Sequence, residues 1–399
     1  MKNLVLIGGG HSHAIALRLL GMHPLAADIR LTLITNVIDT PYSGMLPAYV
    51  SGYYSFKECH INLTNLAEFA QANLVLDSAI NLDLANKKVI CQSHAPIDFD
   101  WLSIDIGSTP AAIANAQEHI IPIKPVPNFL KHWHQFLTEL EVSPPVEQLR
   151  IGIVGGGAGG VELALAIKIR IEAILRSQNV PTSILEIHLF HRQSTLMTGY
   201  PANVGKRMEK ILKQQGVYIH LREGVSKVTS SPSPATLSGS KLIICESGLT
   251  LACDRVFWVT SAIAPDWIRN SGLATDEKGF ILINDKLQSI SHPSIFATGD
   301  IATSISHPRP KAGVFAVRQG KPLFHNLQRV TLQQLLRSFY PQKRALSLIG
   351  VGCYPSSNGK KLQAIAAWDW LCIGPSSLLW RWKESIDRKF MQLFEQIKT

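Results

Sequence analysis

The chain has 399 residues, of which 46% are hydrophobic and 17% charged, and its formal net charge is +10. These values exclude a disordered chain, a collagen-like chain and a small disulfide-stapled peptide, and the length suffices for about two to three domains with large buried cores. The positive charge favours acidic partners, a class that includes nucleotide phosphates, anionic lipid headgroups and nucleic acid.

The six cysteines are widely scattered and never form a CxxC pair, which argues against a zinc site or a disulfide framework and favours a reducing, cytoplasmic compartment. No apolar stretch approaches the roughly 20 residues that a membrane-spanning helix needs. The glycines at 8–10 interrupt the N-terminal apolar run too early for a signal peptide. We therefore expect a cytoplasmic protein that does not span a bilayer but can lie on one.

The chain begins with an apolar run at residues 3–7, a glycine cluster, a helical pattern through 14–20 and a second apolar run at 31–34. This order predicts a βαβ unit, and fully apolar strands indicate a parallel sheet covered on both faces. The same order returns at residues 151–190, with a strand, glycines, a helix over about 159–176 and another strand.

The repetition continues through residues 74–106 and 217–260, which both predict strands joined by turns. Gly10 and Gly157 are 147 positions apart (157 − 10). We predict two nucleotide-binding units in series, each for one dinucleotide, joined at the Pro-rich stretch 122–127.

After residue 262 the pattern changes. It predicts short strands at 279–283 and 294–298, and a helix through 314–317 that continues over 320–338. The last sixty residues contain turn-forming Pro and Gly residues and then a helix over about 377–397.

The second glycine cluster satisfies G-x-G-x-x-G with Gly155, Gly157 and Gly160, after a strand and at the start of a helix. Glycines at these positions permit the tight turn, the close approach of a pyrophosphate and close helix–strand packing, and the helix N-terminus favours an anion. The cluster predicts a dinucleotide site.

The residue that reads the adenosine ribose normally follows the next strand and is acidic for NAD. Here His191 and Arg192 occupy this place. Two interpretations are open: Arg192 binds a 2′-phosphate, which favours NADPH, or it is a solvated surface charge.

The first glycine cluster has Gly8 and Gly10 but places His13 where the third glycine belongs. Either the helix lies further from the strand, or His13 finds a hydrogen-bond partner there. His11 and His13 lack a third ligand, so we predict no metal site. The acidic residue expected after the next strand is also missing, and Asn36 can contact ribose hydroxyls there as a neutral group.

A third signal is Ala297-Thr298-Gly299-Asp300, late in the chain. A strand that ends in Gly299 and Asp300 places a carboxylate where it can accept hydrogen bonds from a polyol chain. Gly-Asp alone is an ordinary turn, but it is specific in combination with two upstream dinucleotide units.

In this order and spacing, the three motifs resemble the FAD-dependent pyridine nucleotide oxidoreductases of the glutathione-reductase-like fold, over about residues 1–340. The resemblance implies that FAD lies on the first unit with Asp300 at its ribityl chain, and that NAD(P)H lies on the second. It also implies that Glu162 faces the nicotinamide and that Gly107 and Ala262 lie at strand ends that touch the nucleotides.

Residues 40–47 occupy the place where the disulfide reductases carry a cysteine pair, and they contain no cysteine. Cys59 lies beside His60, which can activate it, but a buried inert thiol is the preferred interpretation. The sulfide:quinone reductases need mid-chain cysteines, which are absent between Cys91 and Cys245.

The chain therefore resembles the type II NADH dehydrogenases and, more closely, a flavoprotein module joined to selenophosphate synthetase in some bacteria. The runs at 8–13, 40–47 and 308–320 carry this likeness. It implies that Lys311 and Ala312 precede a helix whose N-terminus faces the flavin pyrimidine.

The predicted C-terminal helix carries an apolar stripe at spacings of three and four, made of Leu379, Trp382, Ile386, Phe390, Leu393 and Ile397. A basic amphipathic helix with a tryptophan can lie in an anionic membrane interface, where a lipid-soluble quinone is reached. The alternative is that the stripe docks on the protein itself or on a second subunit, as in a homodimer.

We thus predict an α/β fold of two Rossmann-like domains with a C-terminal extension. The FAD-binding domain comprises 1–120 and 265–340, the NAD(P)H-binding domain 121–264 and the extension 341–399. The predicted function is hydride transfer from NAD(P)H to flavin and electron transfer to a quinone or another small acceptor without a redox-active disulfide. The alternative is a slow redox-sensing flavoprotein that acts through partners, in selenium or sulfur metabolism. Nothing but the overall charge favours nucleic acid, which we exclude as a partner.

Overall fold

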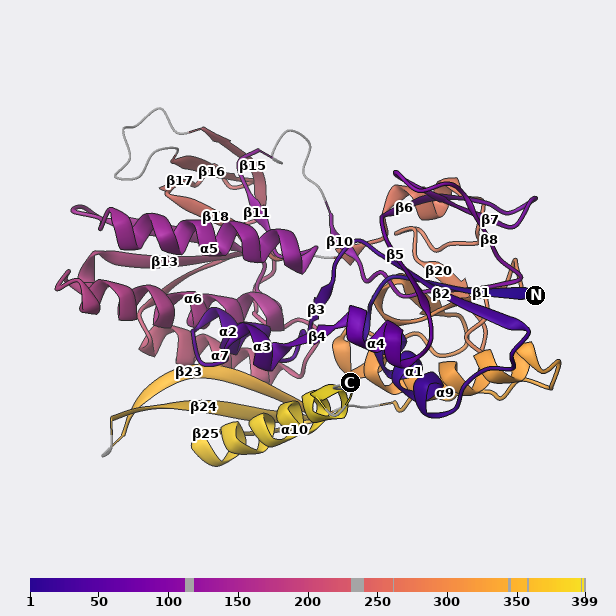
Figure 1. Ribbon diagram of the computed structural model, residues 1–399. Helices are drawn as coiled ribbons and strands as arrows, with labels where there is room; N and C mark the ends of the chain where they lie inside the picture. Colours follow the sequence, from indigo (N-terminus) through magenta and orange to yellow (C-terminus); the bar gives the residue numbers. More distant parts are fainter. Residues whose placement is uncertain are drawn as a thin grey trace.

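The computed structural model describes residues 1–111, 118–230, 240–260, 262–343, 346–356, 359–395 and 397. The chain forms two α/β lobes that lie side by side, with a small C-terminal sheet and a long helix packed beneath them (Figure 1).

The first lobe is built on a five-stranded parallel sheet of order β21-β9-β1-β2-β5. Leu4, Val5 and Leu6 are all fully buried. Because successive side chains of a strand point to opposite faces, both faces of this sheet are covered. The strands and helices of the sheet are β1 (Lys2–Ile7), β2 (Ile29–Thr35), β5 (Asn73–Leu76), β9 (Trp101–Ile104), β21 (Ile295–Ala297), α1 (His11–Met22), α4 (Leu63–Phe69) and α9 (Gly313–Thr331).

Smaller elements complete this lobe. They are an antiparallel meander of β6 (Ala79–Asp83), β7 (Lys88–Cys91) and β8 (Ile97–Asp98), a parallel pair of β20 (Ile281–Ile283) and β22 (Ala302–Ser304), the helix α8 (Asp266–Asn270) and the 3-10 turn η2 (Gly299–Ile301). The helix α9 ends at Thr331, so the prediction that it continues to residue 338 is wrong.

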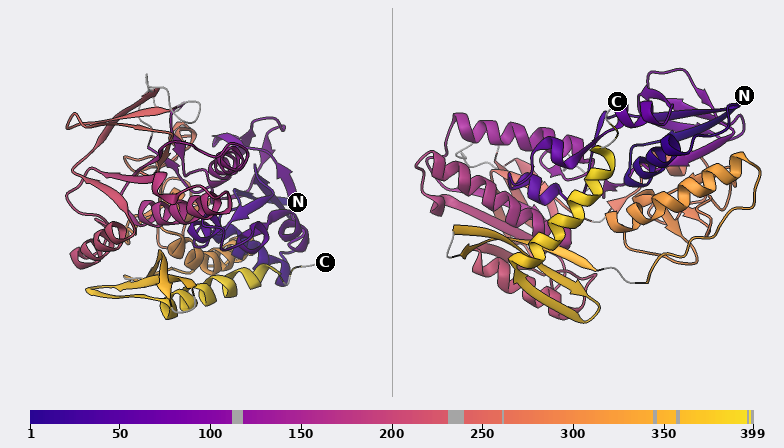
Figure 2. Two further views of the ribbon diagram at one scale, coloured as in Figure 1. Left: turned by 90° about the vertical axis from the view of Figure 1, so that its left-hand side faces the viewer. Right: turned by 60° about the horizontal axis from the view of Figure 1, so that its bottom comes forward.

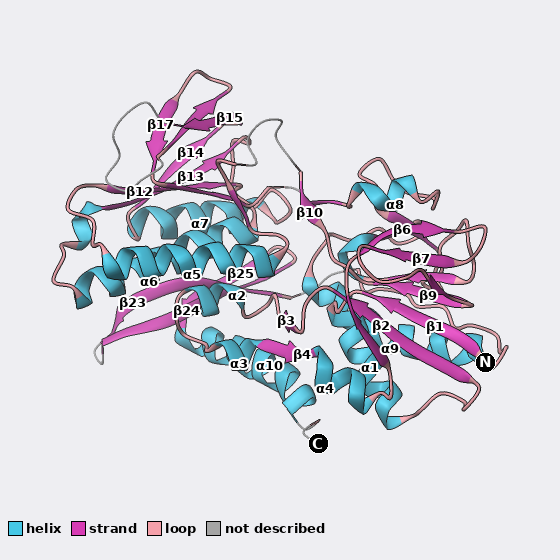
Figure 3. Cartoon of the chain, turned by 45° about the horizontal axis from the view of Figure 1, so that its top comes forward, coloured by secondary structure: helices cyan, strands magenta, loops and turns pink. Residues whose placement is uncertain are grey.

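The second lobe repeats this plan with a parallel sheet of order β11-β18-β12-β13-β14. Its elements are β11 (Ile121–Pro122), β12 (Leu149–Val154), β13 (Leu185–His191), β14 (Val217–Leu221), β18 (Arg255–Trp258), α5 (Val126–Val142), α6 (Ala158–Ser177), η1 (Thr182–Ile184), α7 (Ala202–Gln214) and a meander of β15 (Val225–Ser230), β16 (Lys241–Cys245) and β17 (Thr250–Cys253). The order β18-β12-β13-β14 matches β9-β1-β2-β5 strand for strand, as the internal repeat requires. Figure 3 shows the two sheets with their helices. The predicted α/β fold class is confirmed.

Two short antiparallel ladders lie between the lobes. One pairs β10 (Thr109–Pro110) with β19 (Ala262–Ile263), and the other pairs β3 (Asp39–Pro41) with β4 (His60–Asn62). Between β3 and β4 the chain forms α2 (Leu46–Val50) and α3 (Phe56–Cys59). Leu46 and Val50 belong to the core of the second lobe. Residues from the first unit therefore help to form the surface where the lobes meet.

The C-terminal extension holds an antiparallel sheet that the sequence analysis missed, made of β23 (Ser347–Ser356), β24 (Gly359–Trp368) and β25 (Leu371–Ser376). Glycines in β23 resemble turn residues in the sequence. Gly352 has a φ of +84° and lies where the register shifts between Gly350 and Cys353. The glycines thus mark an irregular strand rather than a loop.

The long helix α10 (Ser377–Glu395) runs from this sheet toward the first lobe (Figure 2). Its inner face buries Trp380, Lys383, Asp387, Phe390 and Met391. Its outer face exposes Leu378, Trp382, Ile386 and Leu393. The predicted single stripe is therefore wrong, because Phe390 packs on the protein while Trp382 and Ile386 face away from it.

Candidate active site

A groove of 670 Å³ runs along the carboxyl ends of β1, β2 and β9 in the first lobe. It collects residues from sequence positions as distant as the first glycine cluster and the start of α9. Among the predicted cofactor-binding residues it is lined by Gly8, Gly10, Asn36, Gly107, Asp300, Lys311 and Ala312. The structure thus brings these seven predicted residues together.

The first glycine loop has no room for side chains. Gly8 has a φ of +92°, and a Cβ on it would overlap the backbone carbonyl of Asp105. A Cβ on Gly10 would overlap the Asp105 carboxyl group. This bare backbone at the N-terminus of α1 is the surface that a pyrophosphate requires.

His13 lies behind the groove rather than in it. Its side chain is fully buried, with Nδ1 2.6 Å from the carbonyl oxygen of Gly8 and Nε2 2.8 Å from Oγ of Ser103. Both ring nitrogens are therefore satisfied inside the protein, and burial lowers the pKa of His13 to about 4. His13 therefore has the hydrogen-bond partners of the second interpretation, and it belongs to the cofactor site only because it holds the glycine loop against β9.

Asp105, at the end of β9, was missed by the sequence analysis. Its Oδ2 accepts hydrogen bonds from the backbone N–H groups of Ser12 (2.9 Å) and His13 (3.1 Å), and the residue is 2% exposed. Burial raises the pKa of its carboxyl group to about 7. The available signal was an ionisable residue that directly follows a buried strand, two positions before the predicted Gly107.

Asp300 projects into the same groove from η2. Its Oδ2 is 2.6 Å from Nζ of Lys124 and accepts a hydrogen bond from Oγ of Ser108 at 3.3 Å. The N–H group of Gly299 donates to Oε1 of Gln319 at 2.7 Å, which fixes the turn that carries the aspartate. Lys124 lies 176 positions from Asp300, so no local motif could have indicated the pair.

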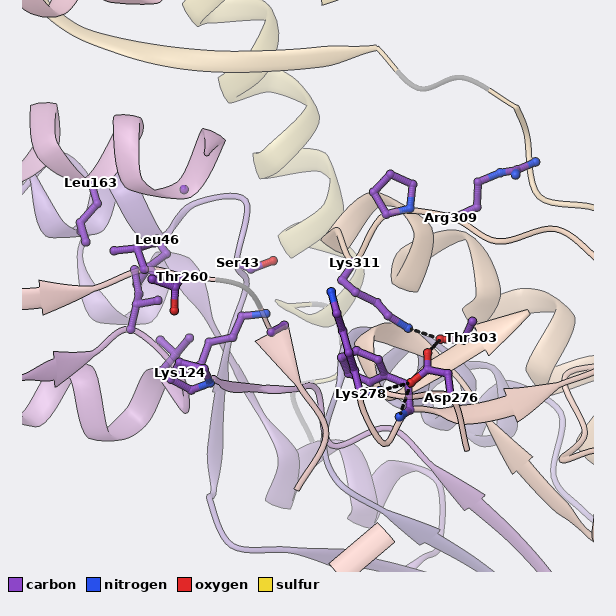
Figure 4. A pocket seen from close by; sticks show the side chains of 18 of the residues that line it. Ser43, Leu46, Lys124, Leu163, Thr260, Asp276, Lys278, Thr303, Arg309 and Lys311 are labelled. Atoms are coloured by element: carbon purple, nitrogen blue, oxygen red, sulfur yellow. Dashed lines mark hydrogen bonds between the residues drawn. The ribbon is translucent and has the colours of Figure 1, made fainter. Parts of the chain in front are cut away.

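A larger pocket of 1090 Å³ opens between the two lobes (Figure 4). One wall includes Gly159, Glu162 and Leu163 of α6, and the opposite wall includes Thr303 and Lys311. Nζ of Lys311 donates to the carbonyl oxygen of Ala302 (2.5 Å) and to Oγ1 of Thr303 (2.9 Å). Burial lowers the pKa of Lys311 to about 8.

The groove and the pocket are continuous at their shared lining residues. Ser43, Lys124, Val126 and Lys311 line both. A cofactor that lies along the groove therefore ends at the pocket between the lobes.

The second glycine loop lies at the N-terminus of α6. Gly155 has a φ of +125°, and a Cβ on Gly160 would overlap the carbonyl oxygen of Gly155. The N–H group of Gly156 donates to Nδ1 of His191 at 3.2 Å, and Arg192 is exposed at the end of β13. The side chain at the ribose-reading position is thus the imidazole of His191 beside the exposed guanidinium group of Arg192, rather than a carboxylate.

Glu162 projects from the first turns of α6 toward the C-terminal extension. Its Oε1 accepts a hydrogen bond from the N–H group of Gly350 at 2.7 Å. Burial raises its pKa to about 7, although the charge of Lys383 acts in the opposite direction. Nζ of Lys383 donates to Oδ2 of Asp387 (2.7 Å) and to the carbonyl oxygen of Gly44 (2.6 Å).

Glu162 also lines a second, inner cavity of 20 Å³, together with Trp380 and Lys383. Trp380 further lines an outer surface pocket of 450 Å³ with Tyr53 and Glu384. Glu162 therefore lines both the inter-lobe pocket and the inner cavity, and we refer to the inner cavity and the outer pocket together as the passage under α10.

A sequence profile of the pyridine nucleotide-disulphide oxidoreductases matches residues 2–320. The chain belongs to this family. The family depends on FAD and NAD(P)H. The two glycine loops, and the carboxylate of Asp300 in the groove, fit these cofactors. The chain is therefore an oxidoreductase of the flavoprotein class.

Two curated relatives illustrate its position within the family. The NADH dehydrogenase-like protein YutJ of Bacillus subtilis is 24% identical over 396 residues, which cover 96% of this chain and 99% of YutJ. The type II NADH:quinone oxidoreductase of Haemophilus influenzae is 26% identical over 195 residues, or 44% of this chain and 42% of that protein. The oxidoreductase is thus similar to NADH dehydrogenase-like proteins.

Among solved structures, the sulfide:quinone oxidoreductase of Aquifex aeolicus matches with a TM-score of 0.76. The identity is 17%, and the match covers 100% of this chain and 92% of that chain. This likeness shows the fold, which includes the C-terminal extension.

None of the described residues that line the inter-lobe pocket is a cysteine. In the described part of the chain, Cys59, Cys91, Cys245, Cys253 and Cys372 are all free. Cys59 is buried, and burial raises its pKa to about 12, so it is a neutral thiol despite Nδ1 of His60 at 3.3 Å. Within the same part of the chain, no helix is long and apolar enough to cross a bilayer.

Proposed function

We propose that this oxidoreductase is an FAD-dependent NAD(P)H dehydrogenase that passes electrons to a quinone-type acceptor without a redox-active disulfide. The observation that carries the proposal is the place of Glu162, which lines both the inter-lobe pocket and the passage under α10. Bound FAD would accept a hydride from the nicotinamide and supply the electrons to the acceptor. The residues of this chain would bind and orient the cofactors and supply a proton.

The first glycine loop, Asp300 and Lys311 would hold FAD along the groove. The loop at Gly155–Gly160 would hold the nicotinamide nucleotide, so that its ring enters the inter-lobe pocket beside Glu162. In this arrangement the lobes orient the two cofactors and exclude water from the space between them. Arg192 supports a preference for NADPH, since the residues at the end of β13 are His191 and Arg192 rather than an acidic residue.

Reduction of a quinone requires two protons as well as two electrons. Glu162 is a suitable proton donor because its raised pKa of about 7 keeps a large fraction of the carboxyl group neutral near neutral pH. The 20 Å³ inner cavity is too small for a quinone ring, so entry of the acceptor requires the Trp380 side chain to move.

The outer face of α10 supports a second part of the proposal, that the protein lies on an anionic membrane surface. Leu378 and Trp382 are 70% and 47% exposed there, and the surface pocket beside Trp380 opens next to the same helix. A quinone dissolved in the membrane would then reach the passage without crossing water.

Anaerobic stopped-flow mixing tests the function in two halves. We expect NADH or NADPH to bleach the flavin absorbance, and a soluble quinone analogue then to restore it rapidly. Mixing with each nucleotide separately gives the preference between them. Persistence of a reduced flavin–nucleotide complex in the presence of quinone would contradict the proposal and support a slow redox sensor.

The variant Glu162→Gln tests the proton donor in the same experiment. We expect reoxidation by quinone to fall about 100-fold, the scale of general acid catalysis. In the unsubstituted protein this rate should decline as the pH rises above about 7, because Glu162 then ionises. The matched control is Glu172→Gln on the same helix, where Glu172 pairs with Lys168 and Arg176. Equal rates for both variants would exclude Glu162 as the donor.

A further inference from the structure

Asp105 lies between the two motifs that form the groove. A Cβ on Gly10 or on Gly299 would overlap its carboxyl group, so it is enclosed by the first glycine loop and by the Gly-Asp turn. Its Oδ2 already accepts the N–H groups of Ser12 and His13, which belong to the first turn of α1. The carboxyl group therefore occupies part of the helix end that an anion would use.

The groups around Asp105 offer little positive charge. The two histidines in the first turn of α1, His11 and His13, are neutral, because burial lowers the pKa of each to about 4. From η2, the negative charge of Asp300 opposes ionisation of Asp105. Two lysines line the groove: Lys124 is engaged with Asp300 at 2.6 Å, and Lys311 donates to Ala302 and Thr303. Among the described residues, no ion pair involves Asp105.

The ionised and neutral forms of Asp105 are closely balanced in this setting. The backbone N–H groups of Ser12 and His13 favour the carboxylate, while burial and Asp300 favour the neutral acid. Burial outweighs the hydrogen bonds, and the pKa lies at about 7. A second anion at the same helix end would shift this balance further toward the neutral acid.

FAD brings such an anion, because its pyrophosphate would lie at the N-terminus of α1. We propose that Asp105 couples FAD binding to proton uptake: its carboxyl group is neutral when FAD is bound and ionised in the free protein at alkaline pH. This inference rests on the binding of FAD in the proposed function. It makes Asp105 the residue that sets the pH range over which the cofactor is held.

Proton linkage determines whether the Kd for FAD rises or falls with pH. Below about pH 7 the free protein already carries the proton, so the Kd for FAD does not depend on pH. Above this value each binding event must take up a proton, so the Kd rises by about tenfold per pH unit until the pKa of the bound form is reached.

The test measures release of FAD from the flavin-loaded protein. Samples are diluted in buffers from about pH 6 to about pH 9, and the fluorescence of free FAD gives the Kd at each pH. We expect the unsubstituted protein to show the rise above pH 7. In Asp105→Asn, the amide oxygen still accepts the N–H groups of α1 but no proton is exchanged. Its Kd should therefore be flat up to about pH 8, where Lys311 begins to lose its proton, and lower at that pH than the Kd of the unsubstituted protein.

Asp254→Asn is the matched control. Asp254 is also buried and also accepts a backbone N–H group, that of Arg150 at 2.8 Å, but it lies in the second lobe. This variant should keep the pH dependence of the unsubstituted protein. A flat Kd in the unsubstituted protein, or an equal slope in Asp105→Asn, would overturn the proposal. Absence of FAD binding at every pH would instead overturn the proposed function.

A second measurement needs no variant. Calorimetric titration of the flavin-depleted protein with FAD at about pH 8, in buffers of different ionisation enthalpy, counts the protons exchanged. Uptake of about one proton per FAD supports the coupling, and no uptake excludes it.

Discussion

At the scale of single residues, neighbouring glycines of the second loop meet different surroundings. A Cβ on Gly160 would overlap the carbonyl oxygen of Gly155, whereas a Cβ on Gly159 would meet only Cγ1 of Val259 at 3.6 Å. The second distance is an ordinary van der Waals contact. Gly160 therefore holds α6 close to the loop, and Gly159 does not.

This difference gives a matched pair of variants. We expect Gly160→Ala to displace the loop and to slow flavin reduction by NAD(P)H about 100-fold, the cost of a shift of about 1 Å in a reacting geometry. FAD should stay bound, because its groove lies in the other lobe. Gly159→Ala should slow flavin reduction much less than Gly160→Ala, because an added Cβ at Gly159 overlaps no atom of the loop. Stopped-flow bleaching measures both, and equal losses in the two variants would contradict this account of the loop.

The site residues that could be predicted from the sequence and those that could not differ in how they are arranged along the chain. Gly8, Gly155 and Asp300 stand in local motifs, whose spacing is readable from one sequence. Lys124 contacts Asp300 across 176 positions, and Lys383 contacts Gly44 across 339. Contacts of this kind depend on how the lobes and the extension pack, so spacing alone could not predict them.

At the scale of elements, the two parallel sheets were predictable because each begins with a short, mainly apolar strand that a glycine cluster and a helix follow. The extension was not, because β23 contains Gly350 and Gly352, which resemble turn residues. Their function in the fold is visible only in three dimensions: the N–H group of Gly350 donates to Glu162, and Gly352 has a positive φ. The irregular part of β23 is therefore the part that contacts Glu162 of the candidate site.

The attachment of α10 depends on a buried ion pair. The side chains of Lys383 and Asp387 are 10% and 6% exposed. Lys383 also donates to the carbonyl oxygen of Gly44, in the loop between β3 and α2. We expect Lys383→Met to destabilise the docked helix by about 3–5 kcal/mol, because it leaves the Asp387 charge buried without its partner. Melting temperature and protease cleavage within the extension measure the effect.

Arg388→Met provides the control on the same helix. Arg388 pairs with Glu58 and Glu384, but its side chain is 43% exposed, so its loss should cost no more than about 1 kcal/mol. If the two variants were equally stable, the Lys383–Asp387 pair would not be what holds α10 in place.

At the scale of the whole molecule, the extension joins the two lobes. The sheet β23–β25 packs on α6 through β23, and α10 continues to α3 and β4 near the first lobe. The inner face of α10 is thereby committed to the protein, and its outer face is left with apolar side chains. Of the two interpretations of the C-terminal helix that the sequence left open, docking on the protein holds for the inner face, and membrane binding stays a prediction for the outer face.

The net charge of +10 and this outer face together predict binding to anionic vesicles. We expect the flavoprotein to sediment with vesicles that contain phosphatidylglycerol and to be released by salt, which screens exposed charges beyond about 10 Å at 0.1 M. The double variant Trp382→Glu/Ile386→Glu should lose most of this binding, because it removes exposed apolar area and adds two negative charges. The control is Val146→Glu/Leu335→Glu, which makes the same charge change at side chains that are 92% and 87% exposed elsewhere. If both double variants bound equally, net charge rather than the outer face of α10 would determine membrane binding.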